Sequence, residues 1–112
     1  MKNDTLSTKR ETADIVINAF KEKFHPSFEY TSKSGNVKIL ILDKYDFLRT
    51  NSNLAATLLF DFVSNDLCTI NIVVAGGKEG LLHMDFGAED SLLNKIKRFL
   101  QECGSEKPWK EV

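Results

Sequence analysis

The chain is poor in the side chains that build metal and redox sites, since its 112 residues include two histidines and two cysteines. His25, His83, Cys68 and Cys103 show none of the close spacing that a zinc site requires. We therefore expect no metal and no cofactor. Both cysteines fall on apolar faces of predicted elements, which indicates buried thiols in a reducing compartment; a disulfide or a reactive thiol is the alternative.

Net charge is nearly absent as well, because 15 Lys and Arg residues face 16 Asp and Glu residues. A balanced chain without a basic stripe exerts no long-range attraction on nucleic acid or on an anionic membrane. No apolar run approaches the roughly 18 residues that span a bilayer, and the first residues lack the apolar core of a signal peptide. We expect a cytoplasmic protein that binds neither nucleic acid nor membrane.

What is present suits one folded domain over residues 1–112. Apolar residues make up 42% of the chain and charged residues 28%, which is typical of a soluble globular protein. A chain of this length can bury roughly 65% of its unfolded surface, enough for a single core. Residues 104–112, which contain the one tryptophan, Trp109, are expected to form a loose tail.

The strongest structural signal is a β-hairpin over residues 54–75. A two-residue turn at Asn65-Asp66 would pair Phe60 with Asn71 and mix core and solvent residues. A three-residue loop at 64–66 avoids this, because directly paired residues share a face and a one-residue slip inverts every side chain. That loop pairs Phe62 with Cys68, Phe60 with Ile70, and Leu58 with Ile72.

Elements on both sides of the hairpin complete the expected fold. Apolar residues at helical spacing predict one helix over 8–24 and another over 89–103. Thr8 and Glu11 have the spacing of a capping box for the first helix, and Asp4 or Ser7 are alternative caps. Alternating or continuous apolar runs predict strands. Those strands cover 28–31, 37–42 and 81–86, with a two-residue turn at Gly35-Asn36 between the first two.

The predicted order is therefore helix, five strands, helix. Strands joined by short turns are antiparallel neighbours, and two one-sided helices need one apolar sheet face to cover. The sequence predicts an α+β two-layer sandwich, in which a mostly antiparallel sheet of about five strands carries both helices on one face. The strand order in the sheet stays open.

The second face of the hairpin is more apolar than a solvated face needs to be. Scattered exposed aliphatic side chains are one interpretation. The other is a contact surface, most simply in a homodimer whose sheets face each other. We favour a non-enzymatic, self-associating interaction module as the function. The residues of that face are Leu59, Asp61, Val63, Leu67 and Val73.

A ligand pocket or minor enzyme activity near the Gly76–Gly80 loop is the alternative function. Lys78, His83 and Asp85 would supply its polar groups, since a carboxylate can orient an imidazole. The loop lacks the spacing of a phosphate-binding loop, and a strand is expected after it. Ordinary turn glycines and a solvated strand face therefore explain the same residues, and we assign no catalytic residue.

The stretch from Asn53 onward resembles a family of short bacterial proteins of unknown function. The residues that carry the resemblance are NLAATLLFDF, IVVAGGKEG and FGAEDSLLNKIKRFL. They cover roughly the C-terminal half of the chain. The resemblance implies a compact cytoplasmic bacterial protein, and it transfers no active-site or binding residue because the family carries no activity.

Overall fold

The computed structural model describes residues 2–45, 54–76, 88–104 and 110–111. Their helices and strands follow one another as β1 (Lys2–Lys9), α1 (Arg10–Phe24), β2 (Phe28–Thr31), β3 (Val37–Tyr45), β4 (Leu54–Asp61), β5 (Leu67–Ala75), α2 (Ala88–Gly104) and β6 (Lys110–Glu111).

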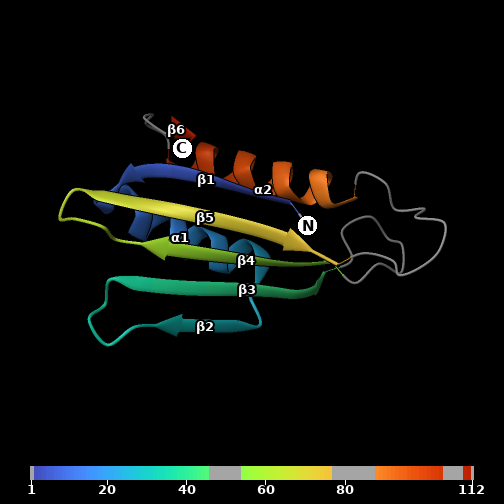
Figure 1. Ribbon diagram of the computed structural model, residues 1–112, viewed down its shortest axis with the longest axis horizontal. Helices are drawn as coiled ribbons and strands as arrows, with labels where there is room; N and C mark the ends of the chain where they lie inside the picture. The colour runs from blue at the N-terminus through green and yellow to red at the C-terminus, as the bar shows by residue number, and fades with distance from the viewer. Residues whose placement is uncertain (1, 46–53, 77–87, 105–109, 112) are drawn as a thin grey trace.

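All strands belong to one sheet with the order β2-β3-β4-β5-β1-β6, and every neighbouring pair is antiparallel. Both helices pack on the same face, as Figure 1 shows for α1 behind the sheet, and their buried residues join one core with the inward side chains of β1, β3, β4 and β5. The predicted α+β two-layer architecture is confirmed.

The hairpin of β4 and β5 has the register that the sequence predicts. Phe60 pairs with Ile70 and Leu58 with Ile72, and these four side chains are fully buried. The ladder ends one step before the expected pair of Phe62 and Cys68. On its other side β4 continues its pairing with β3, since the Phe62 amide donates to the Asn36 carbonyl at 2.8 Å. Ser64 closes the connecting loop through its hydrogen bonds with Asp66 and Leu67.

The two helices bury the stripes that their spacing predicts. On α1 the buried residues are Ala13, Val16, Ile17, Phe20 and Phe24. On α2 they are Leu92, Leu93, Ile96 and Leu100, with Phe99 and Cys103 packed against the core. Helix α1 ends in a left-handed residue, His25, directly before Pro26, so the predicted end at residue 24 is correct.

The start of the chain is where the sequence prediction is wrong. Residues 2–9 form β1, and helix α1 begins at Arg10 after an N-cap residue, Lys9, whose side chain makes no capping hydrogen bond. The expected capping box of Thr8 and Glu11 is not formed, since Thr8 lies in the strand. The strand forms because all eight of its residues pair with β5. Without β1, the backbone N–H and C=O groups at that edge of β5 would lack hydrogen-bond partners.

The turn between β2 and β3 is also longer than predicted. The Ser32 amide donates to the Val37 carbonyl at 2.9 Å, so the turn inside this pair consists of the four residues 33–36, not of two. Gly35 has a φ of +79° in this turn, a conformation that favours glycine. The predicted strand at 81–86 and the tail residue Trp109 lie outside the described residues.

Candidate functional site

The sheet face that points away from the helices is the candidate functional surface, and we call it the outer face. Residues that are paired across neighbouring strands share a face, so the outer face is built of cross-strand rows. The central row runs through Tyr30, Ile39, Leu59, Asn71 and Thr5. A second row runs through Phe28, Ile41, Thr57, Val73 and Asn3, and a third through Val37, Asp61, Thr69 and Ser7.

Three of the five residues that the sequence assigns to a contact surface lie in these rows: Leu59, Asp61 and Val73 are half-buried on the outer face. Leu67 and Val63 lie at the turn end of the hairpin, with 39% and 51% of their surfaces exposed. The predicted residues thus form one side of a continuous surface.

The other half of the outer face was not predicted from the sequence. Phe28 and Tyr30 of β2 are 52% and 48% exposed, and they stand beside Ile41 and Ile39 of β3. The continuous apolar run of β3 did carry the signal. Its even-numbered residues Leu40 and Leu42 are buried under the helices, which leaves the isoleucines for the outer face.

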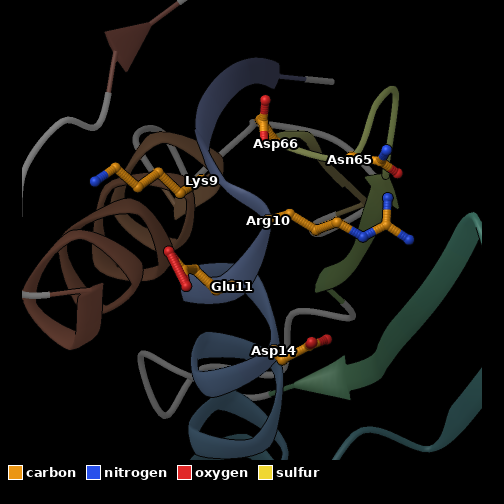
Figure 2. A pocket seen from close by; sticks show the side chains of 6 residues that line it. All are labelled: Lys9, Arg10, Glu11, Asp14, Asn65 and Asp66. Atoms are coloured by element: carbon orange, nitrogen blue, oxygen red, sulfur yellow. The ribbon is translucent and has the colours of Figure 1, made fainter.

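A separate cavity of about 540 Å³ lies beside the start of α1, where the turn between β4 and β5 approaches the helix. Lys9, Arg10, Glu11, Asp14, Asn65 and Asp66 line it (Figure 2). Lys9 and Arg10 point in opposite directions, so the charged groups do not converge on one point.

The Arg10 side chain serves the fold in this region. Its guanidinium donates to the Ser64 carbonyl at 2.8 Å and approaches Asn36 Oδ1 at 3.5 Å, and it lies 4.6 Å from the centre of the Phe62 ring. Arg10 therefore joins α1 to the ends of both hairpins. A residue held this way is better suited to stabilising the turns than to binding a ligand.

The two cysteines are free thiols, and neither is activated as a nucleophile. Burial raises the pKa of Cys68 to about 12, and the nearby carboxylate of Asp61 acts in the same direction. Burial also raises the pKa of Cys103, which Glu102 reinforces. Because the thiolate is the reactive form, both groups are poor nucleophiles at neutral pH. The prediction of a buried thiol is confirmed for Cys68, while Cys103 is partly exposed.

The described residues bring together no other chemical site that the sequence suggested. Among them, no three His, Cys, Asp or Glu side chains are placed to hold a metal ion. No helix within the described ranges has the length and apolar character needed to cross a bilayer. Lys78, His83 and Asp85 lie outside the described residues, as does most of the Gly76–Gly80 loop, so the ligand pocket stays a prediction.

Comparison with known proteins adds a family without adding an activity. No curated protein and no solved structure matches the chain. One family does match, with the description "Family of unknown function (DUF6054)", over residues 5–104. The match includes the N-terminal half as well as the C-terminal half that carries the sequence resemblance. Because it spans most of the sequence, the chain belongs to the DUF6054 family, a family of unknown function.

Proposed function

We propose that this protein is a non-enzymatic interaction module that forms a homodimer through its outer face. One observation carries the proposal: apolar side chains from β2, β3, β4 and β5 gather on a sheet face that no described element covers. A solvated sheet face normally alternates with the core face as polar against apolar. On β3, isoleucines on the outer face alternate with buried leucines, and on β2 the apolar residues, Phe28 and Tyr30, both lie on the outer face.

The exposed aromatic residues give this surface a substantial driving force. Phe28 and Tyr30 each keep about half of their surface accessible, which is roughly 100 Å² for a ring of this size. Covering that area contributes about 2.5 kcal/mol per residue before the entropic cost of association. Aromatic residues of this kind are enriched among those that dominate binding energy at interfaces.

The size of the outer face matches one side of a protein dimer. Five neighbouring strands lie about 4.8 Å apart, which gives a width of roughly 24 Å. The longer strands contain eight or nine residues, so the face is roughly 26–30 Å long. The resulting area of roughly 600–700 Å² is close to the surface of about 800 Å² that each partner buries in a standard interface.

The described chemistry favours binding over catalysis. The thiols have raised pKa values, and the charged side chains beside α1 diverge. A flat apolar surface accommodates a second sheet better than it encloses a small molecule, which binds in concave pockets. The free thiols and the family resemblance support a cytoplasmic location in a bacterium.

Sedimentation equilibrium over micromolar protein concentrations tests the proposal. We expect a dimer. Leu59→Asp should raise the dissociation constant of this dimer by roughly thirtyfold or more, because the new carboxylate would be buried without a partner, at a cost of about 2 kcal/mol. Ile15→Asp is the matched control, since Ile15 is an aliphatic residue 62% exposed on α1. A wild-type chain that is monomeric at high micromolar concentration, or a dimer that Leu59→Asp leaves unchanged, would refute the proposal.

A further inference from the structure

Polar and apolar residues are unevenly distributed over the outer face, and this distribution indicates how two copies fit together. The half formed by β2, β3 and β4 carries the exposed aromatic residues and the isoleucines of β3. The half formed by β5 and β1 is mostly polar and contributes Thr69, Asn71, Thr5 and Ser7. An interface with an apolar centre and a polar rim would therefore be centred on the first half.

The polar half already satisfies part of its hydrogen-bonding capacity within one chain. Thr5 Oγ1 donates to Asn71 Oδ1 at 2.8 Å across β1 and β5. Groups paired in this way need no donor or acceptor from another molecule. This half of the outer face is consequently suited to the rim, where water also has access.

Within the three rows, the apolar half carries one charged residue. The one charged residue of β2, Glu29, forms a salt bridge of 3.0 Å with Lys21 of α1 and so lies on the helix side of the sheet. In the three rows the sole ionisable carboxylate is Asp61. A two-fold contact places a surface against an identical one, so like charges would repel near the axis. A face without charges at its centre meets this condition for a second copy of the chain.

The position of Asp61 distinguishes two placements of the two-fold axis. If the axis followed the strands between β3 and β4, each Asp61 would lie over Val37 and close to the Asp61 of the partner subunit. If the axis follows the central row, across the strands, the second row of one copy lies over the third row of the other. Ile41 then meets Val37, and Thr57 meets Asp61, whose carboxylate can accept a hydrogen bond from the threonine hydroxyl.

We propose that the two copies pack sheet against sheet with their two-fold axis along the central row, over Ile39 and Leu59. This inference rests on the homodimer proposed above. Two sheets of the same twist pack with strands aligned to within about 30°, so the row-on-row contacts hold best near the axis. The two Asp61 carboxylates would be separated along the strands by four residues, roughly 13 Å, which exceeds the Debye length of about 8 Å in physiological salt.

A pair of opposite charges at one position tests this arrangement. Thr57→Lys places an ammonium group over Asp61 of the partner subunit, whereas Thr57→Glu places a second carboxylate there. Sedimentation equilibrium should show that the lysine variant dimerises at least about tenfold more tightly than the glutamate variant, with a difference that shrinks in high salt. Ser7→Glu, at the rim on β1, should keep the wild-type dissociation constant within about threefold.

Each outcome has a distinct meaning once circular dichroism shows that the variants are folded. A wild-type dimer that both Thr57 variants weaken equally would overturn the axis along the central row and leave the homodimer standing. A wild-type dimer that Ser7→Glu dissociates more than Thr57→Glu does would overturn the placement of the centre. A monomeric wild type would refute the homodimer itself and this arrangement with it.

Discussion

The contact between Lys97 and Asp4 ties α2 to β1, and removing its carboxylate tests how the first strand is held. Lys97 Nζ donates to Asp4 Oδ2 at 2.6 Å, and the Thr5 amide donates to Asp4 Oδ1 at 2.9 Å. The Lys97 and Asp4 side chains are 16% and 26% exposed. This partial shielding strengthens the pair relative to a fully solvated one. We expect Asp4→Asn to lower the free energy of unfolding by about 1–2 kcal/mol at pH 7.

A more exposed ion pair of the same protein provides the control. Lys21 and Glu29 are 3.0 Å apart, but their side chains are 38% and 40% exposed. Solvent screening limits such a pair to about 0.5 kcal/mol or less. Urea unfolding followed by circular dichroism should therefore rank Asp4→Asn as clearly more destabilising than Glu29→Gln. Equal effects of the two substitutions would refute the argument from burial.

The pH dependence of this contact has a defined sign. The hydrogen bond from Lys97 lowers the pKa of Asp4 below its ordinary value of 3.8, against the opposing effect of burial. A carboxylate with a lowered folded-state pKa contributes stability above its unfolded pKa and loses it as the pH falls through the folded pKa. The difference in unfolding free energy between wild type and Asp4→Asn should reach its largest value above about pH 5 and should shrink below about pH 4. A difference that stays constant from pH 7 to pH 3 would show that the charge is not its source.

Two further predictions concern Arg10 and the thiols. Arg10→Ala should lower the free energy of unfolding by about 1–2 kcal/mol, since it removes the hydrogen bond to Ser64 and the stacking on Phe62. In urea unfolding, Arg10→Lys should recover less than half of this lost free energy. Full recovery by the lysine variant would contradict a role for the planar guanidinium. Alkylation of the native protein followed by mass spectrometry should modify Cys103 while Cys68, fully buried with a pKa of about 12, reacts at the rate of global unfolding. Equal labelling of both cysteines would contradict the buried position of Cys68.

The hairpin could be predicted from sequence because its signal is local. Buried residues alternate with more exposed ones along β4 and β5, and one register alone keeps Phe60 and Ile70 on the same face. Strand β1 could not be found in this way. Its one fully buried apolar residue is Leu6, and it becomes a strand through pairing with β5, which is distant in the sequence.

The outer face was half predictable for a related reason. Leu59, Asp61 and Val73 follow from the register of one hairpin, which the sequence determines. The contribution of Phe28 and Tyr30 depends on strand order, because β2 had to be placed beside β3 on the same side of the sheet. The periodicity of a single strand does not indicate which other strands lie beside it in the sheet.

The pairing of β1 with β5 also sets the order in which the protein can be completed during its synthesis. Leu6 pairs with Ile70, and a ribosome that adds about 5–20 residues per second needs roughly 3 to 13 s to make the intervening chain. During that interval β1 has no edge to join, and its polar composition gives other nascent chains little apolar surface to bind. The polar composition of β1, which gives this strand no signal in the sequence, thus protects the chain against aggregation until β5 emerges.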